Sequence, residues 1–198
     1  MEKHLGNLRA FGVPAVVAIN RFPKDTGEEL SLLQAFCQQQ GVASAISDAF
    51  SKGGEGAATL AAEVVRTIET NQSPSVRSAY SASDSVERKI SKIAQVVYGA
   101  ADVEYSQRAK DQLAQFCAWG YRDLPVCIAK TQYSLSDNPK LLEAPVDWTL
   151  HISDVKLSAG AGFLIPVAGS AMLMPGLPKE PRAFEITVDE GGEIVGLL

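Results

Sequence analysis

A short, unbroken apolar run near the start of the chain constrains its fold more than any other feature. Residues 14–19 read Pro-Ala-Val-Val-Ala-Ile, so no polar side chain alternates toward solvent. A run of this kind is typical of a strand that a parallel sheet buries on both faces. Because parallel strands are joined by crossovers that usually contain a helix, the run predicts an α/β fold.

Helical patterns surround this strand in the order that an α/β fold requires. Leu60, Val64 and Ile68 recur every four residues, which is the spacing of a helix with one buried face. The elements predicted for this part are helices at 2–11, 27–40 and 57–69 and strands at 14–19 and 42–46.

A polar stretch at residues 71–75, Asn-Gln-Ser-Pro-Ser, is the predicted boundary inside the chain. It divides an α/β part, residues 1–72, from a smaller α+β part, residues 73–198. In the second part Asp84 and Glu87 have the spacing of a capping box, and Ser106 is suited to cap the next helix. Strands are predicted at 124–129, 148–157, 162–167, 184–188 and 194–197, so the chain is strand-rich after residue 147.

The charge and composition exclude several classes of function. The chain of 198 residues is 46% hydrophobic and has a formal net charge of −5, with its Lys and Arg residues scattered. An acidic chain without a basic patch lacks the electrostatic footprint of a nucleic-acid-binding protein. No apolar run approaches the roughly 18 residues that cross a bilayer, and the polar N-terminus has no signal-peptide pattern. We therefore expect no nucleic-acid partner and no membrane segment.

The three cysteines, Cys37, Cys117 and Cys127, are far apart in the sequence. An odd number at wide spacing is unlike a disulfide framework or a CxxC metal site. Apolar neighbours favour buried free thiols that act as small hydrophobic side chains. The cysteines therefore indicate a reducing, cytoplasmic setting.

The first candidate motif, Asn-Arg-Phe-Pro at residues 20–23, follows the first strand, where a doubly wound sheet binds its ligands. Pro23 ends the strand pattern, so Phe22 is expected on a loop, and an aromatic ring there can stack on a planar ligand. The alternative is structural: Phe22 covers the core and Asn20 caps the turn.

The second candidate, Phe-Ser-Lys-Gly-Gly-Glu-Gly at residues 50–56, precedes the predicted third helix. Glycines let a backbone approach a ligand closely, and the amino end of a helix favours an anion. The order differs from the phosphate-binding pattern GxxxxGK(S/T), because the lysine comes before the glycines and no Ser or Thr follows. A plain glycine-rich turn explains the segment at least as well.

Two later segments are weaker candidates. Lys130, after the predicted strand at 124–129, can pair with a carboxylate or phosphate, although Ser-Asp-Asn-Pro at residues 136–139 is also ordinary turn chemistry. The small residues at 157–163 allow either a close approach or only a tight bend. His4 and His151 have no partner at metal-ligand spacing, and we assign them to a helix surface and a strand.

Five collinear segments carry a resemblance to a known family. They read VVAINRFPKDT, SKGGEGA, LPVCIAKTQYSLSDNPKLL, LSAGAGFLIP and, at the end, MPGLPKEP with VDEGGEIVGL. In this order they resemble the C-terminal portion of formate–tetrahydrofolate ligases, also called formyltetrahydrofolate synthetases. The resemblance covers essentially the whole chain.

The resemblance implies a fold, a reaction and site residues. Family members make formyltetrahydrofolate from formate, tetrahydrofolate and ATP with Mg²⁺, on a P-loop core of the dethiobiotin-synthetase kind, and bacterial members are typically tetramers. By this resemblance Phe22 and Pro23 line the folate pocket. Phe50 stands where many members have a tryptophan that stacks on the folate ring, and Asn20 stands where related proteins read the nucleotide base.

The departure from the family is the phosphate loop, because the chain contains no GxxxxGK(S/T). We therefore expect a C-terminal fragment of the ligase, in which residues 1–72 are the end of the nucleotide-binding-like core. Such a fragment supplies folate-pocket walls and does not bind ATP and Mg²⁺ productively or turn over by itself. The alternative is a non-catalytic assembly module related to the ligase, which self-associates or packs on an upstream ligase domain.

Overall fold

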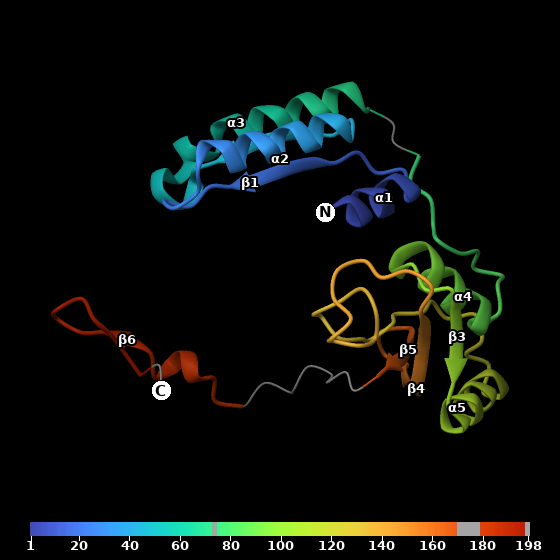
Figure 1. Ribbon diagram of the computed structural model, residues 1–198. Helices are drawn as coiled ribbons and strands as arrows, with labels where there is room; N and C mark the ends of the chain where they lie inside the picture. The colour runs from blue at the N-terminus through green and yellow to red at the C-terminus, as the bar shows by residue number, and fades with distance from the viewer. Residues whose placement is uncertain (73–74, 170–178, 197–198) are drawn as a thin grey trace.

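A computed structural model of the chain describes residues 1–72, 75–169 and 179–196. Two parallel strands, β1 and β2, form the centre of the first part, and their register runs from Val16 opposite Ala43 to Asn20 opposite Ser47. Helices α2 and α3 both pack against this pair (Figure 1). The elements are α1 (Glu2–Ala10), β1 (Val16–Asn20), α2 (Gly27–Gln39), β2 (Ala43–Ser47) and α3 (Ala49–Thr70). The predicted alternation of helices with parallel strands is confirmed.

Helix α2 begins where its sequence supplies a complete cap. The Thr26 hydroxyl accepts a hydrogen bond from the Glu29 backbone N–H at 3.2 Å, and the Glu29 carboxylate accepts one from the Thr26 N–H at 2.8 Å. This capping box satisfies two backbone donors that the first turn leaves free. Helix α2, which connects the parallel strands β1 and β2, therefore has its amino end fixed at Thr26.

The second part is built on a mixed three-stranded sheet in the order β3-β4-β5. Strand β3 is parallel to β4, and β4 is antiparallel to β5. Helix α5 packs on β4, and the core between them includes the buried side chains of Leu113, Leu150 and Leu164. The elements are α4 (Val86–Ile93), the π-helical turn η1 (Ala94–Tyr98), β3 (Asp102–Tyr105), α5 (Gln107–Ala118), β4 (Thr149–Ser158) and β5 (Phe163–Ala168).

Two helix starts test the predicted caps. Ser106 caps α5 as predicted, because its hydroxyl accepts a hydrogen bond from the Ala109 N–H at 3.1 Å. The capping box at Asp84 is wrong. Ser85 caps α4, and Asp84 instead binds Lys92 Nζ at 2.6 Å and the Ser81 N–H at 2.8 Å. The helix therefore starts one residue later than predicted, at a serine whose hydroxyl accepts the Arg88 N–H at 3.3 Å.

The predicted strand at residues 124–129 is reduced to two isolated bridges, which join Val126 to Leu164 and Ala129 to Val167. One lysine holds the start of this segment. Lys89 on α4 is fully buried and donates to the carbonyl oxygens of residues 122, 123 and 124 at 3.4, 3.1 and 3.1 Å. Tertiary hydrogen bonds therefore take the place of a continuous strand ladder.

A small hairpin follows toward the C-terminus, in which β6 (Thr187–Val188) and β7 (Ile194–Val195) are antiparallel. The strand predicted at 184–188 starts later, because the turn η2 (Arg182–Phe184) is a 3-10 helix. The Phe184 side chain there is 83% exposed. Residues 73 and 74 of the predicted boundary and residue 197 of the last predicted strand lie outside the described residues.

Helix α1 ties the two parts of the chain together. Lys3 Nζ donates to the Val96 carbonyl at 2.7 Å, and Asn7 Nδ2 donates to the Val97 carbonyl at 2.9 Å. Gly12, which ends the turn after α1, has φ +69°, and a Cβ there would lie 2.2 Å from the Ser75 carbonyl oxygen. Only glycine fits this crossing of the backbone. Among the described helices, none is both long and apolar enough to span a bilayer.

Candidate functional site

Two phenylalanines meet at the carboxyl ends of β1 and β2. Phe22 follows β1 and Phe50 follows β2, and their ring centroids are 6.5 Å apart with an angle of 40° between the ring planes. They border a cavity of about 310 Å³. Its lining residues are Arg21, Phe22, Pro23, Asp48, Phe50, Ser51 and Lys52. Because parallel strands point the same way, their two following loops converge at one edge of the sheet.

The loop that carries Phe22 is fixed by short-range hydrogen bonds. The Asp25 carboxylate accepts from the Phe22 N–H at 2.8 Å, and the Asp25 N–H donates back to the Phe22 carbonyl at 3.0 Å. The Arg21 N–H donates to the Ser47 carbonyl at 3.0 Å, which extends the strand ladder by one bond. The Phe22 side chain is 55% exposed, so it stands on the loop as predicted and does not cover the core.

The loop that carries Phe50 depends on a close approach of two backbone segments. The Asp48 N–H donates to the Gly56 carbonyl at 3.0 Å, and a Cβ at Gly56 would lie 2.5 Å from the Asp48 carbonyl group. Gly53 has φ 58° and ψ −141°, and this kink separates the turn bearing Phe50 from the main body of α3. Phe50 is thereby held outward, with 87% of its side chain exposed.

The glycine-rich segment is therefore part of α3 rather than a loop before it. The N–H groups of Ser51 and Lys52 donate to the Asp48 carbonyl at 3.1 and 2.9 Å. Backbone donors that are already engaged in the first turn are not available to a phosphate. This geometry fits the interpretation as a structural glycine turn.

One carboxylate joins the two cations of the cavity. Asp48 Oδ2 lies 3.1 Å from Lys52 Nζ and 3.8 Å from Arg21 Nη1. All three side chains keep contact with solvent, so each ion pair contributes only about 0.2–1 kcal/mol. Their effect is geometric: Asp48 holds both cations beside the aromatic pair.

Asn20, the predicted nucleotide-side residue, is the last residue of β1, opposite Ser47. Its side chain is exposed, and it is not among the residues that line the cavity between Phe22 and Phe50. The structure thus brings together three of the predicted residues, Phe22, Pro23 and Phe50, and leaves the fourth outside.

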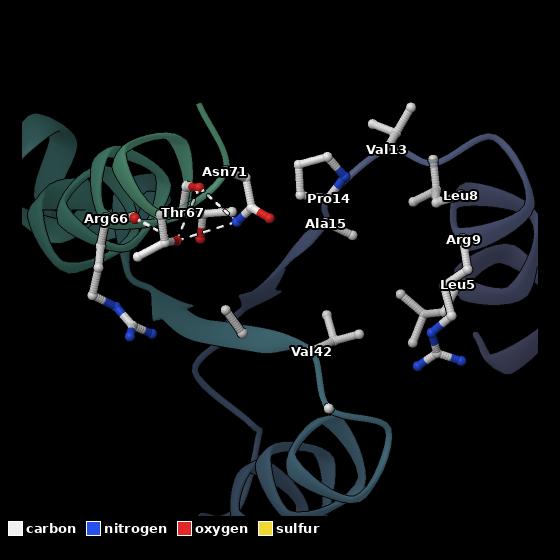
Figure 2. Close-up of a pocket in the computed structure, with 13 residues that line it drawn as sticks. Leu5, Leu8, Arg9, Val13, Pro14, Ala15, Val42, Arg66, Thr67 and Asn71 are labelled. Atoms are coloured by element: carbon white, nitrogen blue, oxygen red, sulfur yellow. Dashed lines mark hydrogen bonds between the residues drawn. The ribbon is translucent and has the colours of Figure 1, made fainter. Parts of the chain in front are cut away.

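A second cavity of about 410 Å³ lies at the opposite, amino ends of β1 and β2. Figure 2 shows α1 on one side, with Leu8 and Arg9, and the end of α3 on the other, with Thr67 and Asn71. The polar groups of α3 are engaged within that helix, since Thr67 donates to the Glu63 carbonyl and Asn71 to the Thr67 carbonyl. This wall presents little polar recognition to a ligand.

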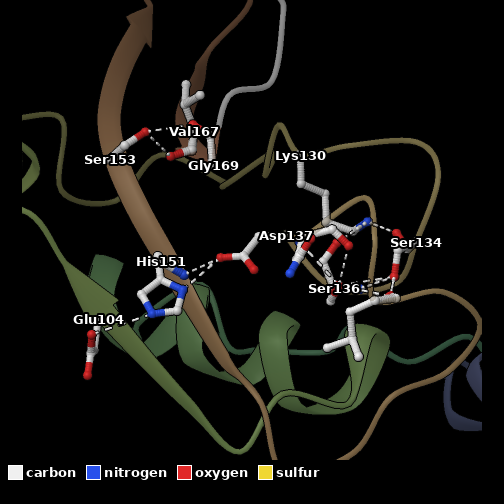
Figure 3. A network of polar contacts seen from close by, with 11 residues as sticks. Glu104, Lys130, Ser134, Ser136, Asp137, His151, Ser153, Val167 and Gly169 are labelled. Atoms are coloured by element: carbon white, nitrogen blue, oxygen red, sulfur yellow. Dashed lines mark hydrogen bonds and ion pairs between the residues drawn. The ribbon is translucent and has the colours of Figure 1, made fainter.

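Lys130 serves the fold rather than a ligand. Its ammonium donates to the carbonyl oxygens of Thr131, Ser134 and Ser136, and Figure 3 shows it beside the latter two residues. It also lies 5.1 Å from the centre of the Tyr98 ring. Burial lowers the pKa of Lys130 from its ordinary value. Of the two interpretations left open, the one of residues 136–139 as a turn fits these contacts. Residues 159–162 form the tight bend between β4 and β5.

His151 has partners that the sequence did not reveal. Its Nδ1 lies 3.0 Å from Asp137 Oδ2, which also accepts the His151 backbone N–H at 2.8 Å, and its Nε2 lies 3.6 Å from Glu104 Oε2 (Figure 3). In the parallel register of β3 and β4, Glu104 lies opposite His151. Predicting this register from the sequence would have placed the two side chains together. Across the described residues, no three His, Cys, Asp or Glu side chains form a group that could hold a metal ion.

The cysteines depart in part from the prediction of buried thiols. All three are free, and Cys37 is buried, but Cys117 is only partly buried and Cys127 is exposed. Cys127 belongs to the segment that makes isolated bridges instead of a full strand, so its side chain is not covered on both faces.

Comparison with known proteins identifies similar sequences over the whole chain. The family model described as formate–tetrahydrofolate ligase matches residues 1–198. A formate–tetrahydrofolate ligase of Phocaeicola vulgatus is 47% identical over 197 residues, all of this chain and 35% of that protein. Ligases of Limosilactobacillus reuteri and Pediococcus pentosaceus are 44% and 41% identical, and the chain covers 36% of each. The chain thus spans about a third of the length of these curated relatives.

Proposed function

The chain belongs to the formate–tetrahydrofolate ligase family, and we propose that it supplies the folate-binding wall of that enzyme through Phe22, Pro23 and Phe50. The whole enzyme would join formate to tetrahydrofolate with the hydrolysis of ATP. This chain is proposed as the part of a longer ligase that holds the flat ring of the folate.

The meeting of Phe22 and Phe50 carries this proposal. Two large aromatic rings that lie 6.5 Å apart and face solvent are unfavourable in water unless a planar ligand or a partner covers them. Stacking on an aromatic ring contributes about 0.5–1.5 kcal/mol beyond the burial of apolar area. The adjoining cavity of about 310 Å³ reaches the lower end of the size range of small-molecule sites.

The residues of this chain do not fit ATP with Mg²⁺ in the manner of a phosphate loop. The only lysine beside the glycines, Lys52, is paired with Asp48, and the backbone donors of its turn are engaged. Phosphoryl transfer needs oriented donors, a lysine and a metal around the phosphates. We therefore propose that another part of the ligase binds the nucleotide, and that Asn20 contributes at most to the edge that faces its base.

We also propose that residues 1–72 form one side of a larger parallel sheet of the P-loop, dethiobiotin-synthetase-like kind, with residues 73–198 as a separate α+β region. A two-stranded sheet is small for a parallel fold, and Leu32 on α2 and Val65 and Ile68 on α3 are exposed apolar side chains. The remaining part of a ligase is the proposed cover, in preference to self-association. The free cysteines are compatible with a reducing, cytoplasmic location.

Titration calorimetry with tetrahydrofolate tests the folate proposal. Wild-type protein is compared with Phe22→Ala and Phe50→Ala, and Phe184→Ala is the matched control because that ring is also exposed but lies on η2. Loss of one stacking ring should weaken binding about two- to thirteenfold. The control should bind like the wild type, and equal affinity of all four proteins would remove Phe22 and Phe50 from the site.

An activity assay tests the proposal that another part of the ligase binds the nucleotide. Incubated with formate, tetrahydrofolate, ATP and Mg²⁺, the chain should form no formyltetrahydrofolate. Measurable turnover would contradict the proposal that the phosphate-binding equipment lies elsewhere.

A further inference from the structure

The charged residues of the aromatic cavity do not balance. Two cations, Arg21 and Lys52, line it with a single carboxylate, Asp48, so the lining carries an excess of one positive charge. The whole chain, in contrast, has a formal net charge of −5. An excess of positive charge at a ligand site on an acidic protein favours an anionic group on the ligand.

Each cation is close in sequence to one of the two rings. Arg21 directly precedes Phe22, and Lys52 comes two residues after Phe50. Both approach the same oxygen, Asp48 Oδ2, at 3.8 and 3.1 Å, so they lie on one side of the cavity and within reach of one small acidic group. When a ligand stacks on the rings, the part of it that extends beyond them therefore lies near the two cations.

Tetrahydrofolate has the matching chemistry, because a flat ring system at one end is followed by a glutamate with two carboxylates at the other. We infer that Arg21 and Lys52 bind the glutamyl carboxylates of the folate, and that Asp48 holds these cations in place when no ligand is bound. This inference rests on the proposed function. It makes the site selective for glutamylated folates over neutral analogues with the same ring.

Binding measurements with three ligands test the inference on the unaltered protein. The ligands are tetrahydrofolate with one glutamate, its form with three glutamates, and its neutral diamide, in which both carboxylates are amides. Because an exposed ion pair contributes about 0.2–1 kcal/mol, the dicarboxylate should bind about 1.4- to fivefold more tightly than the diamide for each cation engaged. Added salt should reduce this ratio by screening the charges.

Variants assign the effect to the two residues. Arg21→Gln and Lys52→Gln should each lower the ratio of dicarboxylate to diamide affinity, and this ratio is read within each variant. Lys24→Gln is the matched control, since Lys24 lies in the same loop but does not line the cavity. It should keep the wild-type ratio.

The failures of the two proposals are distinguishable. If no folate binds at all, both the proposed function and this inference are overturned. If the dicarboxylate and the diamide bind equally to the wild type, the rings are retained as a folate wall and only the inference falls. The inference alone also falls if Lys24→Gln changes the ratio as much as Arg21→Gln. Binding of formate or inorganic phosphate alone that depends on Arg21 would overturn it as well, because the cations would then serve a different anion.

Discussion

Asp48 Oδ2 lies 3.1 Å from Lys52 Nζ, within the turn that holds Phe50 at the edge of the aromatic cavity. The same oxygen lies 3.8 Å from Arg21 Nη1, beside Phe22. One carboxylate therefore links the two loops that follow β1 and β2. Asp48 also begins α3, but its side chain makes no capping hydrogen bond there. Its charge can thus be removed without removing a helix cap.

The first prediction concerns this charge. Asp48→Asn keeps the size of the side chain and removes the internal competitor for Arg21 and Lys52. The ratio of tetrahydrofolate affinity to diamide affinity should therefore rise, by about 1.4- to fivefold. Calorimetry with both ligands measures the ratio. An unchanged or smaller ratio would mean that Asp48 does not compete with the ligand for the cations.

The second prediction concerns the close approach of Gly56 to Asp48. A methyl group on Gly56 meets backbone atoms 2.5 Å away, so Gly56→Ala must displace the turn that bears Phe50. We expect a loss of about 1–3 kcal/mol in the free energy of unfolding, together with weaker folate binding. Urea unfolding followed by circular dichroism measures the loss.

Gly54→Ala provides the matched control for that experiment. Nothing lies within 4 Å of a Cβ at Gly54. The substitution should be neutral or stabilise the helix by up to about 1 kcal/mol. If the two alanine variants were equally unstable, the contact between residues 48 and 56 would not be the cause.

The third prediction concerns the buried ammonium of Lys89. Lys89→Met keeps the apolar stem but leaves the carbonyl oxygens of residues 122–124 without their donor. Hydrogen bonds from a charged group contribute more than neutral ones, and we expect a loss of about 2–3 kcal/mol in the free energy of unfolding. Lys92→Met removes a more exposed lysine from the same helix, and the same urea titration should show a clearly smaller loss for it.

The fourth prediction is a pH dependence. The hydrogen bond from Lys92, and then that from the Ser81 N–H, hold the pKa of Asp84 below its ordinary value of 3.8. A carboxyl group with a lowered pKa in the folded state adds stability above the unfolded pKa, and that stability is lost as the pH falls through the folded value. Asp84→Asn should therefore be less stable than the wild type at neutral pH, and the difference should shrink below about pH 4. A difference that stays constant down to about pH 2 would contradict this linkage.

Local sequence signals predicted the parts of the fold that depend on neighbouring residues. The apolar run at 14–19 became β1, and Ser106 caps α5, because an apolar run and a hydroxyl before a helix act within a few residues. The predicted burial of that strand on both faces is wrong for this chain, since only Ile19 of β1 is buried and Ala18 is exposed. Phe22 and Phe50 were joined only by the family resemblance. In the structure they meet because the carboxyl ends of adjacent parallel strands share one edge.

Features made by distant residues were missed. The pairing of His151 with Asp137 joins β4 to a loop, and the carbonyl oxygens around Lys130 come from a turn whose path the sequence does not encode locally. The segment at 124–129 was apolar enough for a strand, but its bridges to β5 are isolated and Cys127 is exposed. In each case a tertiary contact outweighed the local pattern.

The contacts of α1 also set an order of events in folding. Its hydrogen bonds to Val96 and Val97 span 93 and 90 residues, whereas β1 and β2 are joined within one short crossover. Closing a long loop costs chain entropy before any contact offsets it. During synthesis on the ribosome α1 emerges before its anchors, which appear only after α4 has been made. Helix α1 therefore docks later than the neighbouring unit of β1, α2 and β2 can close.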